Sequence, residues 1–224
     1  MFFVHLKKGA SEKGHIIILN GASASGKTTV QKLLQAHSAN MYITIGIDNF
    51  FDALLPAPDL TEFEKTKTLQ QFTHDGILIR SVTQERDEDG NVLVPLKIGP
   101  AGQKVIYGMH KAIAAYASCG NNIIVDYILY DVRWVEYLKF YLKDYTVYMI
   151  GFKLPLEAIE EREKARKTSP VGHARSHYFS VHNGMQYDLE FSDPAISAEK
   201  IAHAIIEFVK DEKKPAAFLK MLKS

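Results

Sequence analysis

Short apolar runs alternate with segments of helical period along most of the chain. Runs rich in Ile, Val and Tyr are typical of strands buried on both faces of a sheet. Such strands are predicted over residues 15–20, 42–47, 122–126, 145–152 and 185–191. Helices are predicted over residues 27–36, 61–72, 103–118, 132–142, 156–167 and 197–210. The alternation favours an α/β fold in which helices cover both faces of a parallel sheet.

Two segments interrupt this rhythm. An Asp89-Gly90-Asn91 turn signal between two apolar runs predicts a hairpin insertion over about residues 77–97. A polar segment marked by Pro170 and Gly172 predicts a mobile lid over about residues 160–183. No repeat or linker divides the chain, so we expect one domain over residues 1–224, with a 14-residue N-terminal extension.

Composition restricts the possible partners. The chain has 224 residues, 46% hydrophobic and 24% charged, which is typical of a globular protein. Its net charge of +1 gives no long-range attraction to nucleic acid, and no apolar run approaches the ~20 residues that span a bilayer. The one cysteine, Cys119, excludes an internal disulfide. We expect a cytoplasmic protein without a nucleic-acid or membrane partner, and the sequence makes no prediction of oligomeric state.

The segment Gly21-x4-Gly26-Lys27-Thr28 matches a nucleoside-triphosphate loop. It lies between a predicted strand and a predicted helix, as such a loop requires. Glycines let backbone N–H groups face a phosphate, and the helix N-terminus adds partial positive charge. Lys27 would bridge the β- and γ-phosphates, and the Thr28 hydroxyl would bind Mg²⁺. The residues expected to bind ATP are Gly21, Ala22, Ser23, Ala24, Ser25, Gly26, Lys27, Thr28 and Thr29.

Two aspartates follow apolar runs. Asp48 is expected at the carboxyl edge of the second strand, where ligands bind in parallel sheets. There it either orients and deprotonates an acceptor hydroxyl, or caps a turn. Asp126 ends the run Ile123-Ile-Val-Asp126, a pattern whose carboxylate helps to hold Mg²⁺ beside Thr28.

The helix before the lid carries Arg162 and Arg166 on one face, four residues apart. These guanidiniums either close over the triphosphate and stabilise the transition state, or belong to a solvated charged helix. His173, His177 and His182 have spacings that zinc ligands can use, but no carboxylate lies among them. We therefore interpret them as lid or surface histidines.

Together these motifs resemble those of the chloramphenicol phosphotransferase family of small P-loop kinases, over roughly residues 15–210. The segment after the lid, Val-His-x-Gly-x-x-Tyr-Asp, is the most distinctive of them. The matching segments are 16–21 with the phosphate loop, Gly46-Ile-Asp48, Lys97-Ile-Gly-Pro100, 123–126, the Arg162 and Arg166 helix with Gly172-His-Ala, and 181–190.

The resemblance implies a P-loop kinase fold with a central loop strand among five parallel strands, a lid, ATP and Mg²⁺. It implies transfer of the γ-phosphate to a hydroxyl of a small organic acceptor, with Asp48 at the position of the family's proposed base. Lys27 and Thr28 match the phosphate and magnesium positions, and Arg162 and Arg166 fall in the lid. The chain departs from the family at Tyr127, where relatives often carry a second acidic residue, and in a longer, more charged hairpin.

Alternatives to this function stay open at the level of sequence. A GTPase is disfavoured because no Asn-Lys-x-Asp segment is present. A kinase of the nucleoside or nucleotide type would use the same loop with a base in the acceptor pocket. A non-catalytic ATP-binding regulatory module would bind ATP without an acceptor. A protein or RNA acceptor is the remaining alternative.

Overall fold

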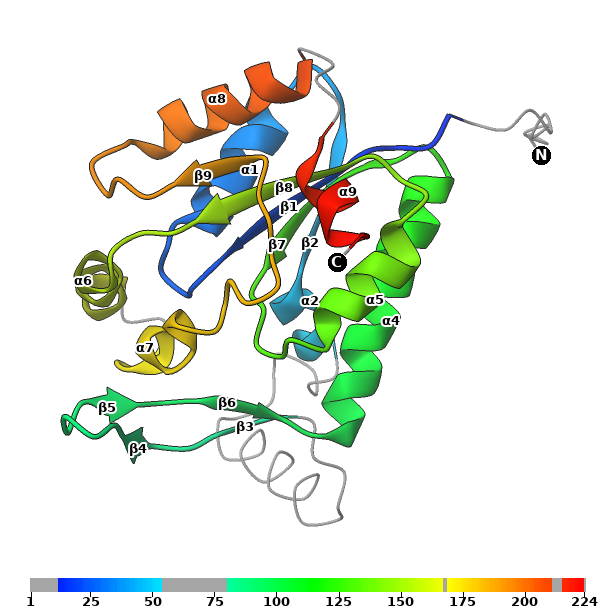
Figure 1. Ribbon diagram of the computed structural model, residues 1–224. Helices are drawn as coiled ribbons and strands as arrows, with labels where there is room; N and C mark the ends of the chain where they lie inside the picture. The colour runs from blue at the N-terminus through cyan, green and yellow to red at the C-terminus, as the bar shows by residue number, and fades with distance from the viewer. Residues whose placement is uncertain (1–11, 54–79, 167–168, 211–214, 224) are drawn as a thin grey trace.

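A five-stranded parallel sheet forms the centre of the protein (Figure 1). The computed structural model describes residues 12–53, 80–166, 169–210 and 215–223. The strand order is β2-β7-β1-β8-β9, which places the strand before the phosphate loop in the middle and confirms the expected sheet. The strands are β1 (Ile16–Gly21), β2 (Tyr42–Gly46), β7 (Asn122–Tyr127), β8 (Val147–Phe152) and β9 (Leu189–Phe191).

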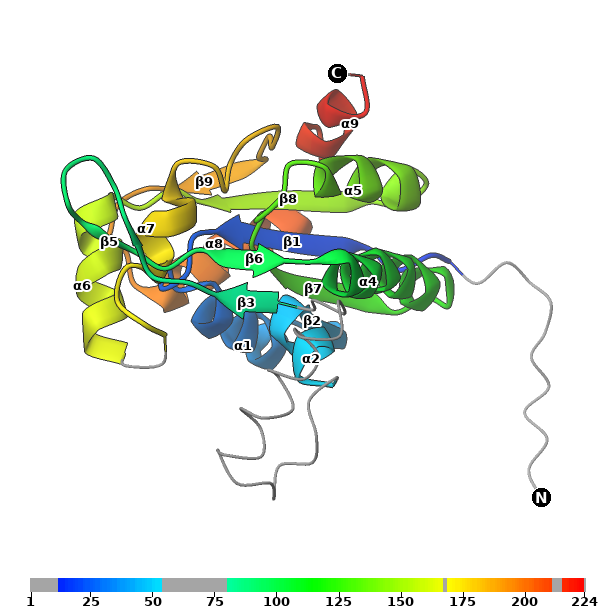
Figure 2. The same cartoon turned by 90° about the horizontal axis from the view of Figure 1, so that it is seen from below.

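Helices cover both faces of the sheet (Figure 2). Along β1, Ile16 and Ile18 face one apolar cluster, and Ile17 and Leu19 face the other, as the period of a strand requires. The first cluster includes residues of α4 (Pro100–Ser118), α5 (Trp134–Leu142) and α9 (Ala217–Met221). The second includes residues of α1 (Lys27–His37) and α8 (Ala198–Lys210). No helix among the described residues is long and apolar enough to cross a membrane.

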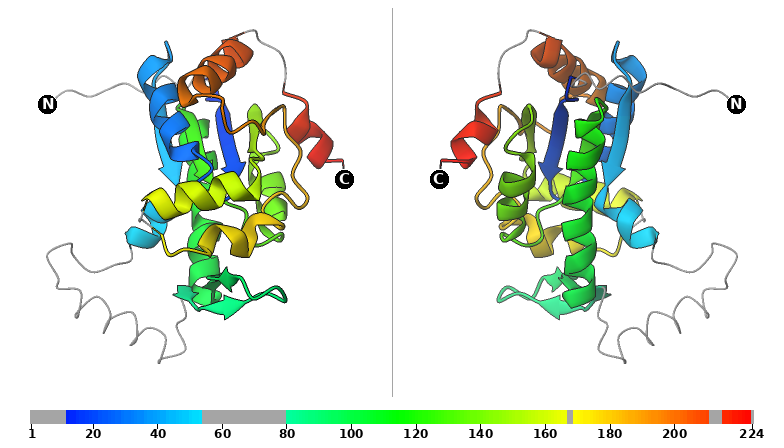
Figure 3. Two further views of the ribbon diagram at one scale, coloured as in Figure 1. Left: turned by 90° about the vertical axis from the view of Figure 1, so that its left-hand side faces the viewer. Right: turned by 90° about the vertical axis from the view of Figure 1, so that its right-hand side faces the viewer.

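The remaining elements lie near the carboxyl ends of the strands. Figure 3 shows α6 and α7 crossing in front of these ends, with the hairpin next to α7. In the hairpin, β3 pairs with β6 and β4 pairs with β5, around a turn in which Gly90 has a positive φ of 81°. These elements are α2 (Ile47–Asp52), β3 (Arg80–Val82), β4 (Glu85–Arg86), β5 (Val92–Leu93), β6 (Leu96–Ile98), α6 (Leu156–Arg166) and α7 (His173–Tyr178).

Several predicted boundaries were wrong. The last strand begins at Leu189 rather than at residue 185, and just before it the amide of Asp188 donates to the Met149 carbonyl of β8 at 2.8 Å. Its carboxylate accepts hydrogen bonds from the amides of Met149, Ala216 and Ala217, and so ties α9 to β8. The polar segment 168–183 contains the helix α7 instead of only loop. The predicted helix over 61–72 lies outside the described residues.

Helix α4 carries a buried histidine that makes stability depend on pH. Nδ1 of His110 lies 2.7 Å from the Ile106 carbonyl, and Nε2 lies 3.0 Å from the Tyr127 hydroxyl. Since a carbonyl only accepts, Nδ1 carries a hydrogen, and the neutral form of the ring then accepts at Nε2 from the Tyr127 hydroxyl. Burial lowers the pKa of His110 from 6.5 to about 4. Between these two values the unfolded chain binds a proton that the folded protein does not bind.

We therefore expect the free energy of unfolding to fall as the pH decreases from about 6.5 towards 4, with roughly 3 kcal/mol of the loss due to His110. Chemical denaturation of the wild type and of His110→Leu at pH 7 and pH 4.5 measures the difference. The variant should lose less stability on acidification than the wild type. Equal losses in both proteins would contradict the assignment to His110.

Candidate functional site

The phosphate loop joins β1 to α1 and has the backbone of an anion cradle. Ala24 and Gly26 have positive φ values of 61° and 99°, which turn successive amides inward. A Cβ at Gly21 would lie 2.7 Å from the Phe152 carbonyl oxygen, so a side chain does not fit there. Among the described residues, the amides of Ala24, Gly26, Lys27 and Thr28 have no protein acceptor. The loop therefore offers four N–H groups to an anion.

Lys27 lies folded over this cradle. Its side chain is 4% exposed, and Nζ donates to the Ala22 carbonyl at 2.9 Å and contacts the Ser25 hydroxyl at 3.4 Å. Burial lowers the pKa of Lys27, and Arg166 lowers it further. The charges of Asp126 and Asp48 act in the opposite direction and raise it. An ammonium group thus lies beside the free amides, with two carboxylates near it.

Thr28 and Asp126 meet at the end of the loop. Oγ1 of Thr28 donates to Oδ2 of Asp126 at 2.5 Å, and Lys27 Nζ lies 3.8 Å from Oδ1 of the same carboxylate. Parallel pairing of β1 with β7 places Asp126 opposite Leu19, close to the root of the loop. A hydroxyl and one carboxylate match what Mg²⁺ takes from a protein when nucleotide phosphates supply further ligands.

A metal site built only from protein side chains would need more ligands than Thr28 and Asp126. Within the described ranges, no group of three or more His, Cys, Asp or Glu side chains is arranged to share a metal ion.

The sequence predicted Asp48 at the carboxyl edge of the second strand, and the structure places it two residues beyond the end of that strand. Strand β2 ends at Gly46, opposite Asp126 in the register, and Asp48 belongs to the first turn of α2. The Asn49 side chain accepts a hydrogen bond from the Gly46 amide at 2.8 Å and so starts this helix. Asp48 is exposed, on the side of the sheet where its charge reaches Lys27.

The two lid arginines border a cavity of about 700 Å³ next to the loop. Arg162 donates to the Pro194 carbonyl at 2.9 Å and contacts the Ser25 carbonyl at 3.4 Å, so it joins α6 to the loop. Arg166 also borders the cavity and is exposed. The other walls come from the start of α1 and from residues 194–198 before α8.

A family model described as "Chloramphenicol phosphotransferase-like protein" matches residues 14–210, most of the chain. The chain belongs to this family. A provisionally named O-phosphotransferase of Mycobacterium tuberculosis is 26% identical over 211 residues, 94% of this chain and 89% of that protein. As a member of the chloramphenicol phosphotransferase-like family, the protein is a phosphotransferase of the P-loop type.

Solved structures share the fold. A sugar kinase from Janibacter has a TM-score of 0.55 at 17% identity, covering 88% of this chain and 95% of that one. The APS kinase of Mycobacterium tuberculosis, solved with AMPPNP and APS, has a TM-score of 0.55 at 14% identity, covering 88% and 98%. At these identities the likeness concerns the fold alone, and it confirms the P-loop kinase fold.

Asn20 is a site residue that the sequence reasoning missed. It is fully buried at the end of β1, and its Nδ2 donates to the Val181 carbonyl at 2.8 Å and to the Tyr187 hydroxyl at 2.7 Å. Its Oδ1 accepts from the Leu129 amide at 3.2 Å. The Tyr187 hydroxyl also lies 2.6 Å from Nδ1 of His182. The distinctive family segment 181–190 thus supports the root of the loop, and a lone Asn in an apolar strand was its signal.

Tyr187 packs against a strand that has room for it only because Gly151 lacks a side chain. A Cβ at Gly151 would lie 2.7 Å from the Tyr187 ring. We expect Gly151→Ala to lower the free energy of unfolding by roughly 1–3 kcal/mol, because the ring must move off the sheet and away from Asn20. Chemical denaturation measures this loss.

Gly108→Ala is the matched control, since nothing lies within 4 Å of a Cβ at that position in α4. It should leave stability unchanged or raise it by up to about 1 kcal/mol, because alanine favours a helix. Equal stability of Gly151→Ala and the wild type would contradict the packing argument.

The lid and the hairpin are attached to one another. Glu163 of α6 is buried and accepts hydrogen bonds from the amides of Gly172 and Ala174, at 2.8 and 2.7 Å, which fixes the start of α7. Val94 in the hairpin donates to the Gly172 carbonyl at 3.1 Å and accepts from Nδ1 of His173 at 2.9 Å. Arg175 contacts Glu160 at 2.6 Å and Asp87 at 3.6 Å. Helices α6 and α7 and the hairpin are therefore joined to one another.

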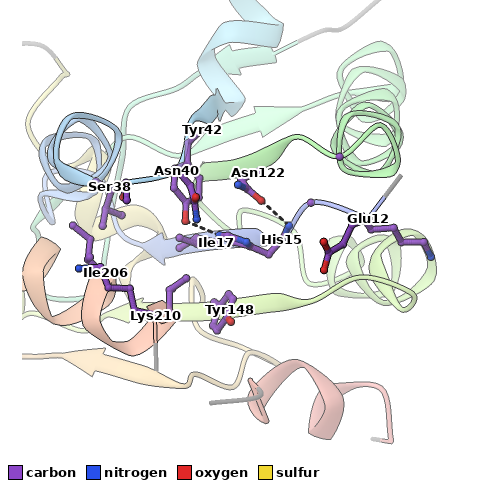
Figure 4. Close-up of a pocket in the computed structure, with 16 residues that line it drawn as sticks. Glu12, His15, Ile17, Ser38, Asn40, Tyr42, Asn122, Tyr148, Ile206 and Lys210 are labelled. Atoms are coloured by element: carbon purple, nitrogen blue, oxygen red, sulfur yellow. Dashed lines mark hydrogen bonds between the residues drawn. The ribbon is translucent and has the colours of Figure 1, made fainter. Parts of the chain in front are cut away.

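A second cavity lies at the opposite end of the sheet and is separate from the phosphate loop. Figure 4 shows this space of about 570 Å³, with His15, Tyr42, Asn122 and Tyr148 among the side chains that line it. Nε2 of His15 lies 2.6 Å from the Tyr42 hydroxyl. These residues come from the amino ends of the strands, so the length of β1 separates them from the loop.

Proposed function

We propose that the protein is an ATP-dependent kinase that transfers the γ-phosphoryl group to a hydroxyl of a small organic acceptor. The observation that carries this proposal is the contact between Thr28 and Asp126, 2.5 Å long, beside the buried Lys27 at the mouth of the loop. This arrangement is the one that positions a nucleotide triphosphate and its metal for transfer. A simple glycine-rich connection would not require it.

The loop would bind the phosphates, and the neighbouring cavity would bind the rest of ATP. The free amides of Ala24, Gly26, Lys27 and Thr28 would face the β-phosphate, and Lys27 would bridge the β- and γ-phosphates. A volume of about 700 Å³ is within the range of ligand pockets and accommodates a base and a ribose. Thr28 and Asp126 would hold Mg²⁺, which neutralises charge on the phosphate oxygens when bound.

Transfer then needs an acceptor oxygen in line with the γ-phosphorus. The acceptor oxygen forms a bond to this phosphorus, and the bond from phosphorus to the β,γ-bridging oxygen breaks, so that ADP leaves. We assign Asp48 as the base that orients the hydroxyl and takes its proton. Lys27 stabilises the negative charge on the transferring group, and Arg162 and Arg166 add positive charge when the lid closes.

Several features support a small acceptor. The family takes its description from chloramphenicol phosphotransferase, and the mycobacterial relative is named an O-phosphotransferase. The net charge of +1 gives RNA no electrostatic attraction. The cover over the loop, made by the lid and the hairpin, would exclude water, which competes with the acceptor.

Transfer of radiolabelled γ-phosphate from ATP·Mg²⁺ tests the proposal. The acceptors are chloramphenicol, other antibiotics with an alcohol group, nucleosides and small sugars. A labelled organic product identifies a kinase, and the compound labelled separates a nucleoside kinase from other types. Label found only as free phosphate, at a rate that Asp48→Asn does not change, would contradict the proposal and favour a regulatory ATP-binding module.

A further inference from the structure

A histidine of the lid contacts the phosphate loop through the backbone. The amide of Ser23 donates to Nε2 of His177 at 3.1 Å, and the His177 side chain is only 5% exposed. Because an amide can only donate, Nε2 must be the unprotonated nitrogen, and the neutral ring carries its hydrogen on Nδ1. This contact joins α7 to the loop, although the two segments are more than 150 residues apart in the chain.

The surroundings keep this ring neutral and in place. Burial lowers the pKa of His177 well below its usual value, and His173 and Lys27 lower it further, while the His173 carbonyl acts the other way. The rings of Tyr130 and His173 pack against it, each with its centroid 4.9 Å away. Within the described part of the chain, Nδ1 makes no hydrogen bond of regular geometry, although the His173 carbonyl lies near enough to influence the ring. The bond from the Ser23 amide is therefore the hydrogen bond of regular geometry that holds the ring.

The amides of the loop divide into two groups. Those of Ala24, Gly26, Lys27 and Thr28 have no described acceptor and remain available to an anion. The Ser23 amide donates to His177, and the Ser25 amide donates to the Ala22 carbonyl at 3.3 Å. Just before it, Asn20 holds the Val181 carbonyl, one helical turn beyond His177. The segment from His177 to Val181 thus contacts the chain at two points around the start of the loop, Asn20 and Ser23.

We propose that His177 is a positioning residue that holds the Ser23 peptide and so makes the geometry of the phosphate loop depend on the seating of α7. This proposal depends on the proposed function only for the identity of the nucleotide. With α7 seated by Glu163 and by Val94, the Ser23 amide points away from the phosphates and the next amides point towards them. With α7 displaced, the loop loses this restraint and binds nucleotide less tightly.

The test compares three variants by hydrogen exchange at the Ser23 amide and by calorimetric binding of AMPPNP·Mg²⁺. His177→Leu keeps a side chain of similar bulk but removes the hydrogen-bond acceptor for Ser23. We therefore expect the exchange rate of the Ser23 amide and the dissociation constant of AMPPNP each to rise roughly tenfold. His177→Gln retains an acceptor at similar reach and should restore both values to within about threefold of the wild type. Phe179→Leu changes a side chain that is 77% exposed at the C-terminal end of the same helix, leaves the acceptor for Ser23 in place, and should leave Ser23 exchange near the wild-type value.

Two outcomes would overturn the proposal. One is wild-type exchange and affinity in a folded His177→Leu protein, and the other is a His177→Gln protein as impaired as the leucine variant, which would indicate packing alone. Should the leucine variant fail to fold, nitrogen-15 NMR of the wild-type ring still decides, since a hydrogen on Nε2 excludes the bond. None of these measurements requires phosphoryl transfer, so a failed acceptor search would refute the kinase assignment and leave this inference standing.

Discussion

Lys27→Ala is expected to lower phosphoryl transfer by roughly 10³-fold or more, because the ammonium group is the charge that would stabilise the transferring phosphoryl group. The fold should remain intact. Lys27 is a buried cation whose pKa is lowered chiefly by burial, so its removal takes away a desolvated charge. Asp126 keeps its hydrogen bond from Thr28 in the variant.

The measurement is the initial rate of labelled phosphate transfer, together with circular dichroism and thermal unfolding. We expect an unchanged spectrum and a midpoint equal to or above that of the wild type. Lys111→Ala removes the same charge from the exposed surface of α4 and should transfer at the wild-type rate. Full activity of Lys27→Ala would exclude the loop as the site of transfer.

Asp48→Asn should lower turnover by roughly 10²- to 10⁴-fold, the range that a positioned general base contributes. Asparagine keeps the size and one acceptor oxygen but cannot take a proton at this position. ATP affinity should change by less than about threefold, since the proposed role appears only in the transition state. Steady-state kinetics with ATP and acceptor varied independently would separate turnover from affinity.

Asp126→Asn provides the contrast for this experiment. Its carboxylate contacts Thr28 and lies near Lys27, so its loss should weaken metal-dependent nucleotide binding as well as turnover. A parallel loss of affinity and turnover in Asp48→Asn would place that residue with the nucleotide instead of the acceptor. Activity of Asp48→Asn at the wild-type level would remove it from the reaction.

The sequence predicted those parts of the site that depend on neighbouring residues. The loop from Gly21 to Thr28 lies between a strand and a helix, and both are recognisable from local periodicity. The position of Asp126 followed in the same way from an apolar run. Asp48 was placed at a strand end, whereas the Asn49 side chain ends that strand two residues earlier by starting α2. A side chain that caps a helix shifts a boundary without changing the hydrophobic pattern.

Contacts between distant segments could not be predicted. The bonds from Asn20 to Val181 and from His177 to Ser23 join residues that no period relates. His177 was interpreted as a lid or surface residue, and burial against the loop became visible only in three dimensions. Glu163 was likewise part of a charged helical pattern, although two amides of the next helix require its carboxylate.

The bonds of Asn20 also concern the order in which the protein is made. A ribosome synthesises the loop more than 100 residues before Leu129, and the partners Val181 and Tyr187 emerge later still. Strand β1 likewise waits for β7 and β8 as its neighbours in the sheet. A nascent chain arrested before residue 181 therefore carries the complete loop sequence without the contacts that shape it. The nucleotide site would therefore take its final shape only after Tyr187 has been synthesised.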